Sequence, residues 1–294
     1  MSKVHFEKIA LIGIGLIGGS IALEARKRGL ATSIVAATRS AETAALANRL
    51  KLADHCGTDL AAAVKDADLV IVCTPVGACG PATAAIASSL KPGCIVSDVG
   101  SVKQTVIADM LPHIPKGVHF VPAHPVAGTE NSGPEAALLD LFEGRWTILT
   151  PLPDSDAGAV NRLEAFWKAL GSQVDRVDPA HHDRILAITS HLPHLIAYTI
   201  VGTADDLGGH LNAEVLKYAA GGFRDFTRIA ASDPTMWRDI FVNNKEAVLE
   251  VLQRFQEDLF YLQRAIRWGE GDKLSELFTR TREIRRALIH LNQA

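Results

Sequence analysis

His124 is the side chain best suited to acid–base chemistry in this 294-residue sequence. It follows an expected strand and precedes Pro125, which stiffens the loop around it. An imidazole titrates near neutrality, so His124 could take a proton from a substrate hydroxyl as a general base. Ser101 could orient the same hydroxyl, or it could cap a helix that begins near Lys103, a residue we expect to be solvated. A histidine in a loop is more often a turn residue, so both catalytic roles are hypotheses.

Arg228 is the best candidate for holding a carboxylate. The pair Gly221–Gly222 breaks the chain before a helix that places Arg224 and Arg228 on one face, with Asp225 beside Arg228. A guanidinium binds a carboxylate through two parallel hydrogen bonds, which gives affinity and orientation together. The alternative is a surface ion pair, worth at most about 1 kcal/mol.

Two further histidines, His191 and His194, lie on one face of an expected long helix. Pro193 lies between them and should kink that helix. We predict no metal there, because neither an HExxH pattern nor an acidic third ligand accompanies the pair. Substrate contact and packing at the kink are the two remaining interpretations. Trp237, on the next helix, could face the same site or belong to the core.

A G-x-G-x-x-G pattern near the start of the chain predicts a dinucleotide site. Gly13, Gly15 and Gly18 lie between a strand-like run, Ile9–Ile12, and a helix expected over Ser20–Arg28. The first glycine permits the turn, the second lets a pyrophosphate approach the backbone, and the third allows close helix–strand packing. The amides and dipole at the start of the helix would then favour the phosphates.

The end of the next expected strand favours NADP over NAD. Enzymes that use NAD usually place Asp or Glu at that point, to accept hydrogen bonds from the ribose hydroxyls. This chain has Thr38, Arg39 and Ser40 instead, and Arg39 could pair with a 2′-phosphate or remain a solvated loop residue. The residues that we expect to contact the cofactor are Gly13, Gly15, Leu16, Ile17, Gly18, Thr38, Arg39, Ser40, Thr74, Pro75 and Ser101.

Strand and helix signals alternate through the first part of the chain. This alternation predicts an α/β fold, a Rossmann-type domain with a mostly parallel sheet, whose ligands bind outside the carboxyl ends of the strands. After Asp178 only helical periodicity remains, so we expect a dinucleotide-binding domain over 1–178 and an all-α domain over 179–294. The expected strands are Ile9–Ile12, Ser33–Ala37, Asp68–Pro75, Cys94–Asp98, His119–Pro125, Trp146–Thr150 and Gln173–Val177.

The C-terminal region predicts helix–helix packing. From Phe241 onward a long helix carries apolar residues in alternating steps of four and three, a heptad-like seam. Such a seam must be buried, either by a final helix over Lys273–Leu291 or by another chain. Arginines on that final helix are expected to form a solvated face and not a nucleic-acid patch. The seam residues are Val248, Leu252, Phe255, Leu259, Leu262 and Ile266, and the arginines are Arg280, Arg282, Arg285 and Arg286.

Composition argues against several classes of protein. The formal net charge of −3 disfavours a general polyanion binder, so we expect no nucleic-acid partner. Apart from the glycine-rich stretch, we find no segment near the roughly 20 apolar residues of a membrane span, and we predict no membrane partner. The cysteines form no CxxC pair and have no zinc-site spacing, which favours a reducing, cytoplasmic location. They are Cys56, Cys73, Cys79 and Cys94.

Five motifs in order give the chain a specific resemblance to the prephenate/arogenate (cyclohexadienyl) dehydrogenase family of tyrosine biosynthesis. They are GIGLIGGS, SDVGSVK, AHPVAGTENSGPE, TSHLPHLIA and GGFRDFTR, and with Trp237 they span most of the chain. The chain resembles the monofunctional members, because we find neither a mutase nor an ACT module. The resemblance implies oxidative decarboxylation of prephenate, arogenate or both, with hydride transfer to NAD(P).

The resemblance also implies roles for individual residues. His124 would be the base, Ser101 would orient the hydroxyl, and Arg228 would hold the ring carboxylate. Glu130 and Asp225 are acidic candidates for the ammonium group of arogenate, and the choice between substrates stays open. The helical domain would bind substrate and form a homodimer. The residues expected to contact substrate are Arg228, His191, His194, Gly221, Asp225, Trp237, Thr129 and Glu130.

Two other interpretations remain. One is a β-hydroxyacid dehydrogenase or imine reductase, which shares the N-terminal fold and has a helical second half. Those enzymes usually carry a lysine on the long helix after the boundary, where this chain has Ser190 to His194. The other is a sensor that binds NADP without turnover, but a sensor does not need a base, an orienting serine and an anchoring arginine together.

Overall fold

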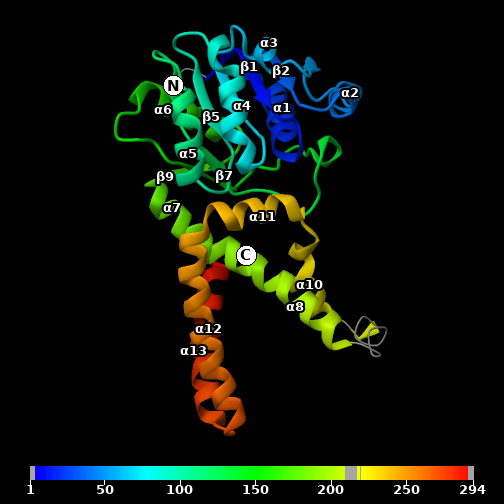
Figure 1. The fold of residues 1–294 in the computed structure, drawn as a ribbon, viewed down its shortest axis with the longest axis vertical. Helices are drawn as coiled ribbons and strands as arrows, with labels where there is room; N and C mark the ends of the chain where they lie inside the picture. The colour runs from blue at the N-terminus through cyan, green and yellow to red at the C-terminus, as the bar shows by residue number, and fades with distance from the viewer. Residues whose placement is uncertain (1–3, 209–216, 219, 291–294) are drawn as a thin grey trace. The chain divides into compact units, whose positions relative to one another are not determined.

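The computed structural model describes residues 4–208, 217–218 and 220–290 (Figure 1). The chain divides into two compact units, Met1–Lys245 and Glu246–Ala294. The first unit contains every residue that the sequence assigns to chemistry. The expected boundary near residue 178 falls inside this unit, and the division at that point remains a prediction.

A six-stranded parallel sheet forms the centre of the first unit, with strand order β3-β2-β1-β4-β5-β6. This arrangement confirms the predicted α/β class with a mostly parallel sheet. The short third strand was not expected from the sequence, because only three residues pair there. The strands are β1 (Phe6–Ile12), β2 (Ala31–Ala37), β3 (His55–Gly57), β4 (Leu69–Val72), β5 (Ile95–Asp98) and β6 (His119–Phe120).

Two apolar cores cover the two faces of this sheet. Successive residues of β1 alternate between them: Ile9 and Leu11 join one core, while Ala10 and Ile12 join the other. Burial on both faces explains why the central strands read as continuous apolar runs. Helices α1 (Leu16–Arg28), α2 (Ala41–Arg49) and α6 (Ala157–Ala169) contribute to the first core, and α3 (Leu60–Val64), α4 (Cys79–Ile86) and α5 (Gln104–Met110) contribute to the second.

The segment expected to be one strand, His119–Pro125, is two strands in different sheets. Strand β6 pairs in parallel with β5, whereas β7 (Ala123–Pro125) pairs antiparallel with β8 (Trp146–Leu149). Pro122 separates them, because proline has no N–H to continue the ladder towards β5. Strand β8 also pairs in parallel with β9 (Gln173–Arg176), completing a three-stranded sheet. His124 therefore lies within a strand and not in a loop, which corrects the expectation.

The helical part of the first unit begins with one continuous rod. Helix α7 (Pro179–Leu186) starts at Asp178, whose side chain accepts hydrogen bonds from the first amides. A π-helical turn, Ala187–His191, then leads into α8 (Leu192–Gly208) immediately before Pro193. We expected no further segment to approach the length and hydropathy of a membrane span. The rod from Pro179 to Leu207 contradicts this expectation, because it is long enough and includes a stretch with a mean hydropathy of 1.4.

Helix α11 packs on one of the two apolar cores that cover the sheet. Trp237 and Ile240 join the core that contains Val76 and Cys79, below the end of β4. This packing places α11 (Pro234–Asn243) beside the turn that follows β4, at the carboxyl end of that strand (Figure 1). Before it in the chain, α10 (Gly221–Thr227) contacts α8 and a 3₁₀ turn at Arg228–Ala231.

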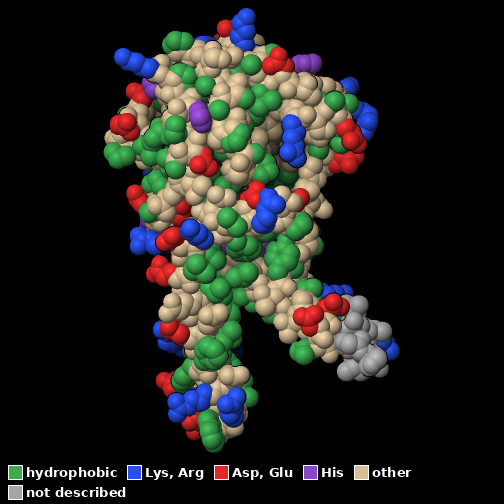
Figure 2. Space-filling model, viewed as in Figure 1, with side chains coloured by type: hydrophobic (Ala, Val, Ile, Leu, Met, Phe, Trp, Pro, Cys, Tyr) green, Lys and Arg blue, Asp and Glu red, His purple; other side chains and the backbone are tan. Residues whose placement is uncertain are grey.

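The second unit is a helical hairpin that exposes apolar side chains. Helices α12 (Lys245–Arg267) and α13 (Gly271–His290) are joined by a short turn. Phe260 and Ile266 are 68% and 67% exposed, and Figure 2 shows hydrophobic side chains on the surface of the hairpin. The final residue of the expected last helix, Leu291, lies outside the described residues.

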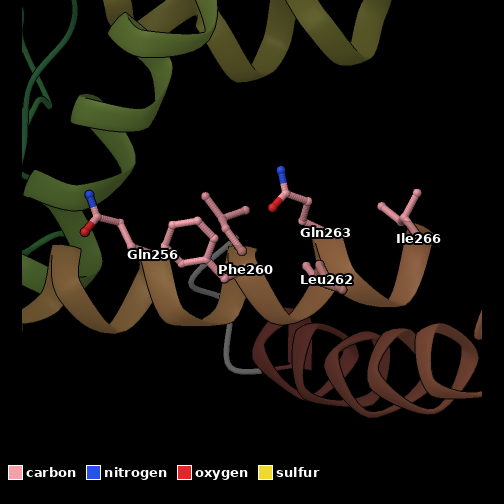
Figure 3. A pocket seen from close by; sticks show the side chains of 6 residues that line it. Gln256, Phe260, Leu262, Gln263 and Ile266 are labelled. Atoms are coloured by element: carbon pink, nitrogen blue, oxygen red, sulfur yellow. The ribbon is translucent and has the colours of Figure 1, made fainter. Parts of the chain in front are cut away.

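An open apolar groove of about 530 Å³ runs along α12 (Figure 3). Its lining includes three members of the predicted seam, together with two glutamines. Because these side chains come from one helix, the groove is an uncovered face and not an enclosed cavity. The lining residues are Gln256, Leu259, Phe260, Leu262, Gln263 and Ile266.

Candidate active site

His124 is buried in the middle of β7 and is only 7% exposed. Its Nδ1 atom lies 2.9 Å from Nε2 of His182, on α7. Burial lowers the pKa of His124 well below its usual value, and His182, Lys103 and His191 add to this effect. The imidazole is therefore neutral near pH 7, which is the form that can accept a proton.

A buried ion pair fixes the strand that carries His124. The Lys103 ammonium pairs with Asp98 at the end of β5 and donates a hydrogen bond to the Ala123 carbonyl, 2.7 Å away. The other Asp98 oxygen accepts from the Ala123 amide at 3.2 Å. Lys103 is fully buried, so the expectation of a solvated helix residue was wrong. A charged lysine can be buried here because its ammonium group pairs with one carboxylate and donates a hydrogen bond to one carbonyl.

Asp183 caps the helix that follows Ser101. Its two carboxylate oxygens accept hydrogen bonds from the amides of Lys103 and Gln104, at 2.7 and 2.9 Å. The cap of α5 therefore comes from a residue 80 positions away, and not from Ser101. Ser101 remains half-buried, and its backbone lies beside the His191 ring.

His191, His194 and Trp237 form an aromatic cluster. The His194 ring stacks on Trp237 with centroids 3.6 Å apart, and His191 meets the indole edge-on at 6.1 Å. Burial lowers the pKa of His191 to about 4 and also lowers that of His194. Nδ1 of His194 contacts the Ser190 carbonyl at 2.9 Å, and Nδ1 of His191 lies 3.1 Å from the amide nitrogen of Asn244. Both rings are thus placed by local partners.

Two buried nitrogens of this cluster have no hydrogen-bond partner within the described part of the chain. They are Nε2 of His191 and Nε1 of Trp237. The Asn244 amide, which also donates to the Asp183 carbonyl at 2.9 Å, leaves Nε2 as the protonated nitrogen of His191. The Ser101 backbone raises the pKa of His191 as an acceptor beside this ring, so the Trp237 N–H is the donor at which a ligand oxygen would be stabilised.

Arg228 pairs with Glu130 and not with the adjacent Asp225. Its Nη1 atom lies 2.8 Å from a Glu130 oxygen, across 98 positions of sequence. A hydrogen bond with its own backbone lowers the pKa of Glu130, and the guanidinium lowers it further; burial lowers the pKa of His194, and the guanidinium adds to this effect, which places it near the aromatic cluster. The Arg228 side chain is 59% exposed and can exchange its partner. Thr129 lies beside this pair in sequence, and its hydroxyl accepts from the Asn131 amide at 3.2 Å.

Gly221 opens α10. A Cβ atom built there would lie 4.0 Å from Asp225 and would meet nothing closer. Asp225 itself is exposed. The two residues expected to contact substrate on this helix are therefore near each other, and the structure gives neither a contact with His124.

The glycine turn has the geometry that a dinucleotide needs. Gly13 has a φ of +100°, and a Cβ there would lie 2.6 Å from the Cys73 carbonyl. A Cβ at Gly18 would lie 2.3 Å from the Gly13 carbonyl, so the helix packs closely on the turn. At Gly15 the nearest atom is the Gly133 amide at 4.0 Å, which leaves room for a phosphate. No side chain caps α1, so its first amides are available to an anion.

The residues expected to select the cofactor lie where β2 meets α2. The Thr38 amide donates to the Gly57 carbonyl at 3.0 Å, and the Ser40 hydroxyl caps α2 by accepting from Thr43. Arg39 between them is exposed. Thr74 follows β4, with its hydroxyl 3.6 Å from the sulfur of Cys79. These loops, with Pro75 at the start of the next turn, follow the carboxyl ends of β2 and β4.

Sequence reasoning missed four buried polar residues at this site: Lys103, His182, Asp183 and Asn244. Lys103 was expected to be solvated, and the other three had no predicted role. Lys103 pairs with Asp98 only five positions away and His182 with its neighbour Asp183, but their other partners lie tens of positions away, so no local pattern identifies the cluster. The one available signal was the adjacent polar residues His182 and Asp183 near the start of the helix that Asp178 caps.

Comparison with known proteins gives consistent matches over most of the chain. Two family models match: prephenate dehydrogenase, nucleotide-binding domain, over residues 21–176, and prephenate dehydrogenase, dimerization domain, over residues 178–280. Cyclohexadienyl dehydrogenase of Zymomonas mobilis is 40% identical over 96% of each chain. Prephenate dehydrogenase of Bacillus subtilis is 34% identical over 96% of this chain and 76% of its own length.

Solved structures agree with these sequence matches. Prephenate dehydrogenase from Aquifex aeolicus, in complex with hydroxyphenyl propionate and NAD+, has a TM-score of 0.87 and 33% identity, covering 96% of this chain and 98% of that one. Synechocystis arogenate dehydrogenase has a TM-score of 0.77 and 29% identity over 95% and 98%. A 3-hydroxyisobutyrate dehydrogenase from Mycobacterium tuberculosis, at 14% identity and a TM-score of 0.50, shares the fold alone.

Proposed function

The chain belongs to the prephenate dehydrogenase family, and from this we propose that it carries out the oxidative decarboxylation of prephenate, arogenate or both. The products are 4-hydroxyphenylpyruvate and tyrosine, so the chain serves tyrosine biosynthesis. One structural observation carries the assignment: His124 is buried, and its charged form is disfavoured by burial and, in smaller part, by His191, which belongs to the aromatic cluster near Arg228. A base, apolar walls and a carboxylate anchor are what this substrate requires.

His124 is the proton acceptor in this proposal. Nε2 of the imidazole takes the proton of the ring hydroxyl as hydride leaves the same carbon, and the proton returns to the phenolic oxygen after the ring becomes aromatic. The bound nicotinamide supplies the hydride acceptor. The bond between the ring and its carboxylate breaks and carbon dioxide leaves. The electron pair of that bond stays with the ring and completes the aromatic system. Ser101 orients the hydroxyl, so the chain mainly positions the reacting carbon.

Arg228 holds the carboxylate of the substrate. Its contact with Glu130 is exposed, and a substrate carboxylate can replace Glu130 as the partner of the guanidinium. The buried N–H group of Trp237 then faces an oxygen atom of the same ligand. Glu130, once released, is an acidic partner for the ammonium group of arogenate, as is Asp225.

We propose NADP as the preferred cofactor, because Thr38, Arg39 and Ser40 provide a cation and two hydroxyls where an acid would favour NAD. The free space at Gly15 supports binding of either dinucleotide. Initial rates with prephenate and arogenate, each with NAD and NADP, test substrate and cofactor together. Equal or higher kcat/KM with NAD would refute the NADP preference, and turnover of neither substrate would refute the function.

We propose a homodimer formed through the C-terminal helices, with the domain division at residue 178 and a cytoplasmic location. The match of residues 178–280 to a dimerization domain and the uncovered groove on α12 support the dimer. The first family model ends at residue 176 and the second begins at residue 178, which supports the domain division there. The four free cysteines suit a reducing compartment. A Phe260→Asp variant should sediment as a monomer, whereas Gln253→Asp, which lies outside the groove lining, should not.

The rival functions lack a supporting observation. The hydroxyacid dehydrogenases share only the fold, and the helix that would carry their lysine has Ser190 and His194 instead. A sensor would bind NADP without turnover. His124→Asn should abolish turnover and leave the dissociation constant for NADP unchanged, and undiminished turnover would remove the base assignment.

A further inference from the structure

Two buried side chains connect His124 to the start of α7. Nδ1 of His124 lies 2.9 Å from Nε2 of His182, and Nδ1 of His182 lies 2.8 Å from Oδ1 of Asp183. The three residues are 7%, 0% and 1% exposed. The mechanism above uses only His124, so the function of the other two remains to be explained.

The direction of hydrogen bonding is fixed at the Asp183 end. Both of its oxygens accept from backbone amides, those of Lys103 and Gln104. Burial by itself would raise the pKa of Asp183, but the hydrogen bonds from His182 and from the two amides outweigh burial and lower it. Asp183 is therefore an ionised acceptor, and the proton between it and His182 belongs to Nδ1 of His182.

The direction of the hydrogen bond at Asp183 also determines the direction of the hydrogen bond between His182 and His124. Burial lowers the pKa of His182, so the ring is neutral and a proton on Nδ1 leaves Nε2 with a free electron pair. Nε2 of His182 is thus an acceptor, and the hydrogen bond of 2.9 Å needs a proton on Nδ1 of His124. The Nε2 atom of neutral His124 must then carry the free electron pair.

We propose that His182 and Asp183 are positioning residues that hold His124 in the tautomer whose Nε2 can accept a proton. The inference rests on the proposed role of His124 as the base. Without these partners either ring nitrogen could carry the proton, and the ring could rotate. When Nε2 takes the substrate proton, Nδ1 still donates to His182, so the new cation meets an aligned acceptor and, beyond it, a carboxylate.

We call the hydrogen-bonded series His124, His182 and Asp183 the relay, and other titratable groups packed around it also act on its two imidazoles. Lys103 and His191 face His124 and disfavour its protonated form. Asp98 and Asp183 face His182 and favour the protonated form of that ring, while Lys103 opposes them. The charges that act on the two imidazoles are therefore one buried cation, Lys103, and two carboxylates, Asp98 and Asp183. The hydrogen bond to His182 is the direct contact with the ring of His124.

Nuclear magnetic resonance of the unmodified protein tests the tautomer directly. Protein labelled with ¹⁵N-histidine should show His124 and His182 with protonated Nδ1 and unprotonated Nε2 at pH 7.5. The two rings are assigned by the signals lost in His124→Gln and His182→Gln. A proton on Nε2 of His124 overturns the proposal, and the tautomer is observed in the unmodified protein, whether or not a variant turns over.

Steady-state kinetics test the consequence. His182→Phe should lower kcat roughly 10- to 100-fold while KM for prephenate and the dissociation constant for NADP change by less than about twofold. His182→Gln, whose amide can donate and accept, should recover part of that loss. The matched control is His181→Gln, because His181 is exposed on the same turn, and it should keep full activity.

The outcomes separate this inference from the function on which it rests. If His124→Asn retains turnover, the base assignment fails and the relay has no catalytic purpose. If His124→Asn abolishes turnover but His182→Phe keeps the kcat of the unmodified enzyme, only the positioning role is overturned. A fall in kcat that glutamine does not relieve, with KM rising in parallel, shows a structural role and also overturns the proposal.

Discussion

The ammonium nitrogen of Lys103 lies 2.7 Å from the carbonyl oxygen of Ala123, the residue immediately before His124. The same nitrogen pairs with Asp98, so one buried cation joins the end of β5 to the start of β7. These two strands belong to different sheets, and the chain between them is broken by Pro122. The contact therefore sets where the strand that carries His124 lies relative to the parallel sheet.

Lys103→Met should destabilise the protein strongly. The substitution keeps the volume of the side chain but leaves Asp98 buried without a cation, at a cost of about 3–5 kcal/mol. Urea unfolding at pH 7.5 measures this loss. The double variant Lys103→Met with Asp98→Asn should recover part of the stability, because it removes the uncompensated charge. A single variant as stable as the unmodified protein would contradict the role given to this pair.

Acid should destabilise the fold between about pH 6.5 and pH 4. The pKa values of His124, His182, His191 and His194 are all lowered, so the unfolded chain binds more protons than the folded one in this range. Their contribution is complete above the pKa of the unfolded state and is lost as the pH falls through the folded values. Each group contributes a slope of up to about 1.4 kcal/mol per pH unit.

Urea unfolding at several pH values measures that slope. His191→Gln should reduce it, because the folded pKa of His191 is about 4 and the variant removes one titrating ring. The exposed control His181→Gln should leave the slope unchanged. A stability that is independent of pH across this range would contradict the burial of neutral imidazoles.

Alanine at Gly13 and at Gly15 should have different effects. At Gly13 the positive φ and the Cys73 carbonyl at 2.6 Å oppose any Cβ, so Gly13→Ala should lower the melting temperature of the free protein. At Gly15 the Cβ has space, so Gly15→Ala should fold normally and weaken NADP binding by roughly tenfold or more. Thermal unfolding and cofactor titration separate the two effects, and unweakened binding by Gly15→Ala would contradict the cofactor site.

Arg39→Ala should reduce the preference for NADP. Loss of a charged partner for the 2′-phosphate costs about 1.5–3 kcal/mol, or roughly 10- to 100-fold in kcat/KM with NADP. The value with NAD should change little, because NAD lacks that phosphate. Arg49→Ala, at an exposed position on α2, is the control for general charge effects. Equal losses with both cofactors would show that Arg39 does not select between them.

Arg228→Ala should raise KM for prephenate by roughly 10- to 100-fold, since it removes a charged hydrogen-bond donor to the carboxylate. Arg224→Ala, an exposed arginine on the preceding helix, should have little effect. Glu130→Gln should have the opposite effect on prephenate, because it frees the guanidinium from its present partner. An Arg228→Ala enzyme with unchanged KM would place the substrate carboxylate elsewhere.

Local patterns were sufficient for the α/β class and the glycine turn. The strand, the turn and the helix around Gly13 and Gly18 are adjacent in sequence, and each residue's conformation follows from short-range sterics. The alternation of buried strands and helices, another local property, predicted the parallel sheet. The same rules failed at Pro122, because which sheet a strand joins depends on partners far along the chain.

The sequence by itself thus determined which side chains could do chemistry, and tertiary structure decided what surrounds them. His124 could be named from its type and its place after a strand, but its partner His182 is 58 positions away. Arg228 meets Glu130 across 98 positions and not its neighbour Asp225. Burial, ion pairing and proton position depend on atoms that only folding brings together, and a linear pattern carries no information about those distances.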